Sequence, residues 1–323
     1  MLDIGTVLAL LRDNIRKTGL PVPVGKEVLW EWSKGLDLPR EGEVLLYTGA
    51  LYQLLPYISV FARQLARMEK SGAGRLAFKA FGKLGGRLGG LAGLVLKPSK
   101  VDIEYSHSIL RSVVELLKAA GVSVAYDPGV DGYSGVLLYD MGLDDDFRAH
   151  AEGEARRLVE SGARVIVTVD PHTTHTLRSV YPKLFPWFEL EVRSYLEILA
   201  ENVDKLGWKS GDAGAVTIHD PCFYARSEGI IGEPRTLLER AGYRVVNPRR
   251  WGRMTYCCGG PVESISPGLA GRIAEKRIEE LHSTGAPVVA VMCPICLSNL
   301  RGHSRGKLRV EDISILLRER LEA

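Results

Sequence analysis

The segment VVAVMCPICLSNL, residues 288–300, joins a short apolar run to two cysteines. A run of Val and Ala of this length is typical of a buried strand in a parallel sheet. Cys293 and Cys296 are separated by two residues, so a single turn can present both sulfurs to one metal centre. The segment therefore predicts a strand that ends at a pair of metal-binding thiols.

The other cysteines extend this pattern, since all five in the 323-residue chain lie in its last third. Cys222 is separated by 34 residues from the adjacent pair Cys257 and Cys258, and 34 more residues separate Cys258 from Cys293. The two glycines after Cys258 would let the backbone approach a cluster closely. Thiolates gathered in this way bind an iron–sulfur cluster or a zinc ion, and ligand softness alone leaves both open. Five thiolates are one more than zinc or an ordinary cubane cluster needs.

Short apolar runs alternate with helical stretches along most of the chain. Strands are expected at 44–47, 122–126, 164–169, 215–218, 244–247 and 288–291. Helices are expected at 236–241 and 267–283. This alternation predicts an α/β fold of two pseudo-symmetric lobes, each a small parallel sheet flanked by helices.

The two lobes are predicted from an internal repeat. The sequence DPHTTHTL at 170–177 aligns with CPICLSNL at 293–300, and YTGALY at 47–52 aligns with HDPCFY at 219–224. The N-terminal counterparts of the cysteines contain no thiol: Ala50, Asp127, Pro128, Asp170 and Thr173. We predict an N-terminal helical extension at 1–43, a lobe without cysteines at 44–204, and a metal-binding lobe at 205–323.

The net charge, the apolar runs and the cysteine usage of the chain limit which partners and which cellular location are expected. The net charge is +3, from 42 basic and 39 acidic residues, so charge gives no reason to expect nucleic acid as a partner. The chain has no apolar run of 18 residues, and its first residues are typical of an amphipathic helix rather than a signal peptide. Reduced thiols in a cytoplasmic protein favour a metal over disulfides.

A basic, glycine-rich insert at 70–100 predicts a helical hairpin with a solvated face, or an element that contacts a membrane surface or a partner.

The pattern C-x34-C-C-G-x33-C-P-x-C resembles the cysteine-rich CCG domain of the heterodisulfide reductase B-like family. Similar domains occur in iron–sulfur subunits of complexes that oxidise glycerol-3-phosphate, lactate or glycolate. The resemblance covers both lobes from about residue 44, and VEDISILLRERL at 310–321 looks like the closing strand and helix of the family. It implies a 4Fe–4S cluster, which is noncubane in the best-known members. The implied ligands are Cys222, Cys257, Cys258, Cys293 and Cys296. Since the first motif is degenerate, a mechanism that needs two clusters is not expected.

By this resemblance the protein is expected to be the iron–sulfur subunit of a cytoplasmic redox complex, active only within it. It would pass electrons between a ferredoxin-type or flavoprotein subunit and a thiol/disulfide substrate or an onward carrier. The chain has no nucleotide-binding fingerprint and no ferredoxin cysteine run, so electrons must come from or go to another polypeptide. The alternative is a zinc-stabilised, redox-silent assembly subunit.

Other residues near the motif have a functional and a structural interpretation. His219 is the catalytic candidate, because it could bond a cluster sulfide, bind substrate or move a proton, but it could equally be a structural donor. Arg249, Arg250 and Arg253 could neutralise the cluster, bind an anion or dock an acidic partner, or form a solvated face. A separate pair of histidines, His172 and His175, is expected to be a relic of the degenerate site rather than a metal site.

Overall fold

The structure is a computed structural model that describes residues 4–73, 76, 96–263 and 265–322. Most of the predicted basic insert, at 74–75 and 77–95, lies outside the described residues, and so does the helical hairpin expected there. None of the helices in the described ranges combines the length and the apolar character that crossing a bilayer requires.

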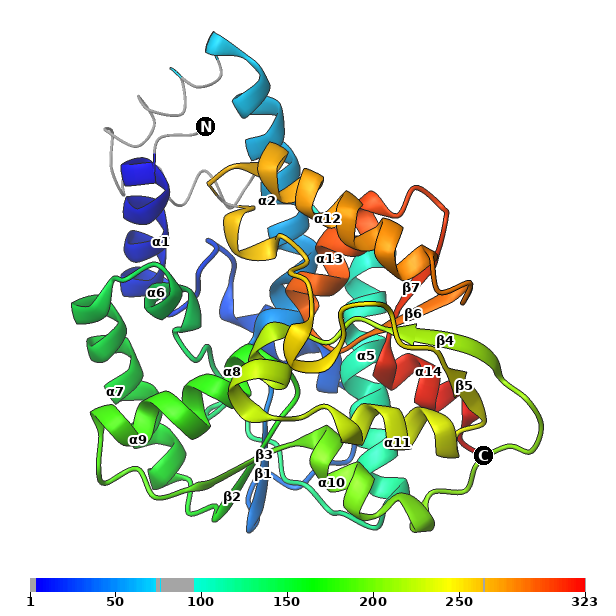
Figure 1. Cartoon of the computed structure of the whole chain (residues 1–323). Coiled ribbons are helices and arrows are strands. Elements are labelled where there is room, and N and C mark those ends of the chain that lie inside the picture. The colour runs from blue at the N-terminus through cyan, green and yellow to red at the C-terminus, as the bar shows by residue number, and fades with distance from the viewer. Residues whose placement is uncertain (1–3, 74–75, 77–95, 264, 323) are drawn as a thin grey trace.

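Two small parallel sheets form the framework of the molecule (Figure 1). The N-terminal sheet has the order β1 (Val44–Tyr47), β2 (Val165–Thr168), β3 (Glu191–Ser194). The C-terminal sheet has the order β5 (Tyr243–Val245), β4 (Gly214–Ile218), β6 (Val288–Val291), β7 (Arg309–Asp312). The last three residues of β1, β2 and β6 are buried, as expected for strands covered on both faces. The predicted α/β fold of two small parallel sheets flanked by helices is confirmed.

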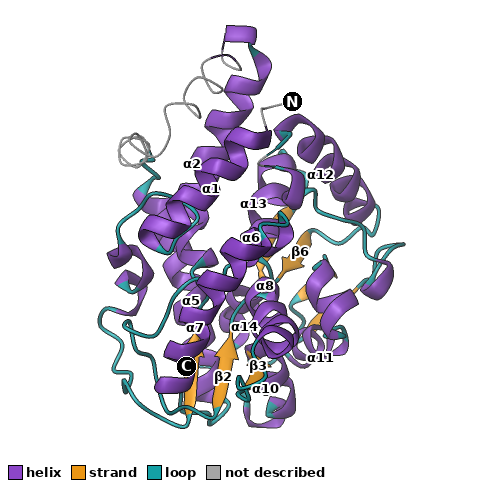
Figure 2. Cartoon of the chain, turned by 90° about the vertical axis from the view of Figure 1, so that its left-hand side faces the viewer, coloured by secondary structure: helices purple, strands orange, loops and turns teal. Residues whose placement is uncertain are grey.

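Helices surround both sheets (Figures 1 and 2). The helices of the N-terminal half are α1 (Ile4–Thr18), α2 (Leu51–Lys70), α5 (Lys100–Ala119), α6 (Val136–Asp140), α7 (Asp144–Glu160), α8 (Pro171–His175), α9 (Tyr181–Leu184) and α10 (Tyr195–Glu201). Those of the C-terminal half are α11 (Gly232–Arg240), α12 (Pro267–His282), α13 (Pro294–His303) and α14 (Ile313–Arg320).

The two halves share a core. Helix α5 packs against α2 and α10 and also against α14, while α2 contacts α12 and α13. One hydrophobic cluster therefore joins residues of both sheets, including Val167 of β2 and Val289 of β6. The predicted lobe boundaries stay predictions, since the helices α5 and α2 pack across them.

A reciprocal pair of tyrosines reflects the predicted repeat. Tyr52 donates a hydrogen bond of 2.6 Å to Asp312, the residue that caps the first turn of α14. Tyr224, its counterpart in the alignment, is hydrogen-bonded at 2.8 Å to Ser194, which caps α10. Each lobe thus sends one buried tyrosine to the same position of the other lobe.

Apart from shifts of one or two residues at strand ends, one predicted strand is not a strand in the structure, and one observed strand was not predicted. The segment 122–126 is not a strand, because it makes only one bridge, between Ala125 and Leu45. The amide of Val122 is bonded to the end of α5 at Leu117, and that of Tyr126 to Pro39, so the segment has no further ladder to join. Strand β3 was not predicted, since only Val192 of its four residues is a buried apolar side chain.

Candidate metal centre

Strand ends bring the cysteines together. Cys222 follows β4, and Cys293 follows the neighbouring strand β6 and immediately precedes α13, which contains Cys296. Because the carboxyl ends of adjacent parallel strands meet at one sheet edge, these loops converge. The long loop after β5 brings Cys257 and Cys258 to the same edge.

The sulfurs form one group. The sulfurs of Cys258 and Cys296 lie 3.3 Å apart, and these two atoms and a ring nitrogen of His219 all lie within 4.8 Å of one another. Cys258, Cys293 and Cys296 are buried, whereas Cys222 and Cys257 are partly exposed, and all five are free thiols. The group is therefore buried at three of its cysteines, and the other two residues, Cys222 and Cys257, lie toward the surface.

The glycines after the cysteine pair perform the role expected of them. The amides of Gly259 and Gly260 lie 3.3 Å from the sulfurs of Cys257 and Cys258, respectively, and donate to them. Gly259 has φ of 89°, and a Cβ there would meet the carbonyl of Ala270, while a Cβ on Gly260 would overlap Ile295. Backbone donors aimed at sulfur favour the thiolate form that metals bind.

Ionised cysteines in this buried group repel one another when no cation is present. Burial raises the pKa of Cys222 to about 11. Hydrogen bonding from Cys257 and Cys296 holds the pKa of Cys258 well below its ordinary value, and hydrogen bonding from Cys258 raises that of Cys296. Neighbouring thiols thus compete for ionisation, because several thiolates in one buried group repel one another. A metal or an iron–sulfur cluster would supply the missing positive charge, so the donor set fits such a group.

His219 is held by a buried arginine. Arg277 donates from Nε to Nδ1 of His219 over 3.1 Å, and both side chains are buried. Since guanidinium cannot accept a hydrogen bond, Nδ1 is the acceptor and the ring proton lies on Nε2. Hydrogen bonding links the ring to Cys258, and burial lowers its pKa. The geometry gives His219 the position of a donor to Cys258.

Arg277 was missed by the sequence reasoning. It also donates to the carbonyl of Arg250 (3.0 Å) and to Glu280 (3.1 Å). A signal was present, because position 277 lies on the buried face of α12 together with Ala274 and Ile278. A charged residue on the apolar face of a helix marks a buried polar contact.

The loop before Cys257 is fixed by Asp220. Arg235 makes a bidentate ion pair with this carboxylate (2.8 and 3.0 Å), and the amide of Gly252 donates to it (2.8 Å). The hydroxyl of Thr255 donates to the carbonyl of Asp220 (2.8 Å). These contacts join the loop after β5 to the end of β4, and so keep Cys222 and Cys257 on neighbouring segments.

The three candidate arginines have different environments. Arg250 is paired with Glu280 at 2.9 Å and lies over the Tyr256 ring at 4.0 Å, so its charge is compensated. Arg249 and Arg253 are exposed. Their neighbours Trp251 and Met254 are 45% and 74% exposed. The surface beside the cysteines therefore combines two solvent-facing cations with two apolar side chains.

The cysteine-free lobe contributes a histidine to the site. Nε2 of His172, at the start of α8, lies 3.4 Å from the sulfur of Cys293. Its ring is buried and packs edge-on against Phe223 at 4.9 Å between ring centroids. Burial lowers the pKa of His172, but the neighbouring Cys293 raises it to about 9 overall. Sequence reasoning assigned His172 to the degenerate site, because no local pattern relates it to a residue 121 positions away.

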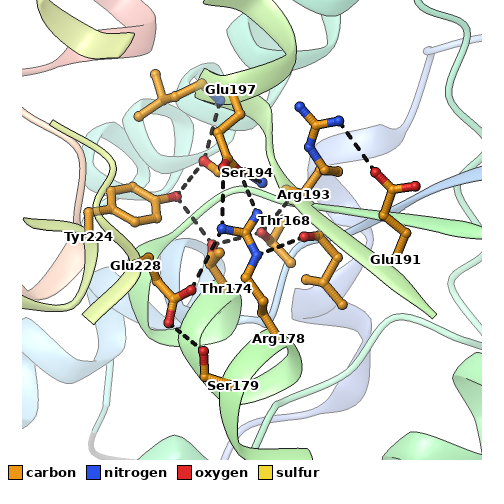
Figure 3. Close-up of polar contacts among 12 residues, drawn as sticks. Thr168, Thr174, Arg178, Ser179, Glu191, Arg193, Ser194, Glu197, Tyr224 and Glu228 are labelled. Carbon is orange, nitrogen blue, oxygen red and sulfur yellow. Dashed lines mark hydrogen bonds and ion pairs between the residues drawn. The ribbon is translucent and has the colours of Figure 1, made fainter. Parts of the chain in front are cut away.

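His175 does not reach the sulfurs. Its Nδ1 lies 2.6 Å from Glu228, and its ring stacks on Phe223 at 4.7 Å. Glu228 also accepts from Ser179 (2.8 Å) and is paired with Arg178, as Figure 3 shows. Together with the Tyr224–Ser194 contact in the same view, this network fastens the π-helical turn after Cys222 to the other lobe.

The degenerate site is filled by its own hydrogen bonds. Asp170 accepts from the amides of His172 (2.8 Å) and Thr173 (3.0 Å) and from the Thr173 hydroxyl (2.6 Å). A Cβ on Gly49 would overlap the side chain of Thr173. Asp127 instead accepts from the amide of Gly129 (2.9 Å) in a partly exposed turn. Asp170, Thr173 and Asp127 thus serve local structure.

Comparison with known proteins agrees with the cysteine pattern. Residues 216–301, which include all five cysteines, match the cysteine-rich domain family CCG. A probable membrane-anchored ferredoxin of Chromohalobacter salexigens is 30% identical over 68% of this chain and 36% of its own length. A probable iron–sulfur-binding oxidoreductase, FadF of Bacillus subtilis, is 30% identical over 62% of this chain and 29% of its own.

A third relative carries the name that the resemblance suggested. It is one of the subunits of the dihydromethanophenazine:CoB–CoM heterodisulfide reductase of Methanosarcina acetivorans, 32% identical over 42% of this chain and 34% of its own length. The chain spans about a third of the length of these curated relatives. The similarity therefore concerns a part of each relative.

Proposed function

The chain belongs to the cysteine-rich CCG family through residues 216–301, and we propose that it is the iron–sulfur subunit of a cytoplasmic redox complex. It holds one 4Fe–4S cluster, of cubane or noncubane form, and is active only with its partners. Electrons pass between a ferredoxin-type or flavoprotein subunit and a thiol/disulfide substrate or an onward carrier. The relatives named as iron–sulfur-binding oxidoreductase and heterodisulfide reductase support the redox class.

The observation that carries the proposal is the convergence of the five thiols at one sheet edge. The ligands would be Cys222, Cys257, Cys258, Cys293 and Cys296. When bound, the cluster supplies one-electron chemistry. The two glycine amides aimed at sulfur are donors of the kind that metal-bound thiolates accept.

The chain's own residues would tune and shield this group. His219 holds its ring proton toward Cys258 because Arg277 occupies the other nitrogen. His172 lies against Cys293 from the opposite lobe. Burial of three of the cysteines excludes water from the inner side, while Cys222 and Cys257 leave one side open to a substrate or partner.

We place partner docking beside this open side. Arg249 and Arg253 give positive charge, and Trp251 and Met254 give the apolar contact area that transient redox interfaces use. Arg250 belongs to the loop framework, because Glu280 compensates its charge. The expected partner surface is acidic.

Reduction kinetics test the docking surface. In the double variant Arg249→Glu/Arg253→Glu, stopped-flow reduction by an acidic ferredoxin-type donor should slow by about tenfold or more at low salt and little at high salt. The charge-matched control Arg164→Glu/Arg244→Glu alters two exposed residues, one just before β2 and one within β5. Equal reduction rates in the two double variants would show that Arg249 and Arg253 do not form the docking surface. Full turnover of a physiological substrate by the isolated chain would contradict the subunit assignment.

The second candidate is the zinc-stabilised assembly subunit. One observation favours it. The donor atoms of His219, Cys258 and Cys296 all lie within 4.8 Å of one another. These three residues would provide three of the four ligands of a structural zinc site. The fourth ligand would be one of the other thiols. The content of iron and zinc separates the two functions.

A further inference from the structure

An apolar cavity of about 410 Å³ lies next to the cysteine group. Its walls are formed by α1, α2, the segment after α1 and the loop after Gly260. Leu11, Ile58, Phe61 and Ile265 are among the side chains that line it. The volume falls within the roughly 300–1,000 Å³ of small-molecule sites, and the apolar lining favours a lipophilic occupant.

One part of the cavity wall is shared with the metal centre. His172, Gly260 and Ile295 all line the cavity. His172 contacts the sulfur of Cys293, and the amide of Gly260 donates to the sulfur of Cys258. Ile295 lies between the two cysteines of the CxxC turn. A molecule at this wall would therefore be separated from the cysteines by a single layer of residues.

The same wall carries an unsatisfied polar atom. Nδ1 of His172 is buried and has no hydrogen-bond partner in the described residues, while Nε2 faces Cys293. The ring is 5% exposed. A buried polar atom without a partner costs free energy, so a ligand that bonds to Nδ1 would be favoured there.

The charges of the cavity restrict the head group of such a ligand. The carboxyl groups of Asp140 and Glu263 line it, and no Lys or Arg is found among its lining residues in the described part of the chain. His172 is the one basic side chain among these lining residues of the described chain, so an anionic head, such as a fatty-acid carboxylate, would bring a third acidic group to a wall with a single basic one. A neutral head that forms hydrogen bonds meets no such penalty.

We propose that this cavity binds a neutral lipophilic molecule whose ring carries carbonyl or hydroxyl oxygens, the chemistry of a quinone or its quinol. The apolar chain lies between α1 and α2, and one ring oxygen is hydrogen-bonded to Nδ1 of His172. A quinone carbonyl accepts a hydrogen bond, and a quinol hydroxyl both donates and accepts one, so either form of the ligand can pair with a ring nitrogen. Binding depends on the cavity alone and does not require the proposed electron transfer.

Calorimetric titration of the metal-loaded protein tests the site. The probe is a naphthoquinone that carries a methyl and a prenyl group on the quinone ring, so that thiols cannot add to it. Leu11→Trp and, independently, Ile58→Trp fill the cavity from α1 and α2. Leu8→Trp is the matched control, because Leu8 lies on α1 outside the lining. Thermal unfolding confirms that each variant is folded.

The proposal expects saturable binding at one site, weakened about tenfold or more by either filling variant and unchanged by Leu8→Trp. His172→Leu should weaken the binding of the quinone but not that of an aliphatic hydrocarbon of equal length. The absence of saturable binding, or binding whose affinity neither filling variant weakens, would overturn the proposal. Palmitate binding as tightly as the quinone would overturn the neutral head group.

Discussion

Nε2 of His172 lies 3.4 Å from the sulfur of Cys293, so the lobe without cysteines touches the cysteine group of the other lobe. The histidine is at the start of α8, whose first turn is capped by Asp170. The degenerate motif thus retains a structural part in the site: its aspartate holds the helix that presents the histidine. This relationship gives the first prediction.

Replacing His172 should change the redox potential of the cluster. His172→Leu removes a hydrogen-bond donor and a positive charge from Cys293, both of which stabilise the reduced, more negative state. We expect the midpoint potential to fall by about 60 mV, the value of one factor of ten for a one-electron couple. Potentiometric titration followed by paramagnetic resonance measures it. His175→Leu is the control, because His175 bonds to Glu228 rather than to a sulfur. Equal potentials in wild type and His172→Leu would show that the contact has no electronic role.

The buried Arg277 should matter for stability. Arg277→Met leaves Nδ1 of His219 and the carbonyl of Arg250 without their donor, and it removes one cation from Glu280. Breaking such a buried network costs about 3 kcal/mol of unfolding free energy. Urea denaturation under anaerobic conditions measures it. Arg272→Met on the exposed face of α12 should change stability by less than about 0.5 kcal/mol. A loss below about 1 kcal/mol for Arg277→Met would mean that water satisfies these groups.

The two aspartates of the degenerate motif should behave differently from each other and from the cysteines. Asp170→Ala removes the cap of α8 and the partner of the Thr173 hydroxyl, so it should cost about 1–2 kcal/mol of unfolding free energy. Asp127→Ala removes only a turn contact to Gly129 and should have a smaller effect. Neither change should lower the iron content per folded chain. Iron loss in a stably folded Asp127→Ala protein would contradict the alignment of the repeats.

Asp131 should make stability depend on pH. It accepts from the amide (2.8 Å) and hydroxyl (2.6 Å) of Thr48 and from Tyr126 (3.0 Å), with Glu154 as a nearby acid. Burial outweighs these donors and raises its pKa to about 6, from 3.8. The folded state therefore binds the proton more tightly than the unfolded state, and the resulting stability is present below pH 4 and lost as pH rises through about 6.

The test compares the wild type with Asp131→Asn, whose side chain does not titrate. The unfolding free energy of the wild type should fall relative to that of the variant between pH 4 and pH 7, by about 2 kcal/mol. Urea denaturation across this range measures the difference. A difference that stays constant with pH would show that Asp131 keeps one protonation state throughout.

The strands and the cysteine group could be predicted because their signals are local. The apolar run at 288–291 gave the bounds of β6, and the run at 44–47 those of β1. The carboxyl ends of parallel strands meet at one edge, which places Cys222 beside Cys293 without further information. Strand β3 gave no such signal, because only one of its four residues is a buried apolar side chain.

Contacts between the lobes could not be predicted in the same way. His172 and Cys293 are 121 residues apart, and their contact depends on how one sheet edge packs against the other. The apolar cavity likewise joins α1, α2 and the loop after Gly260, which no sequence period relates. The tyrosine pair was visible in the alignment, but its partners Asp312 and Ser194 follow only from the packing of the lobes. Position 277 could have been found, since a charge interrupts the buried face of α12.

We propose that the five cysteines hold one iron–sulfur cluster, and metal analysis of protein purified without oxygen decides whether they do. We predict a brown protein with about four irons per chain and little zinc. Cys296→Ala should lose most of this iron, whereas Thr173→Ala, its counterpart in the other lobe, should keep it. One zinc per chain and no iron, found reproducibly in anaerobic preparations, would contradict the account and assign the protein to the redox-silent assembly class.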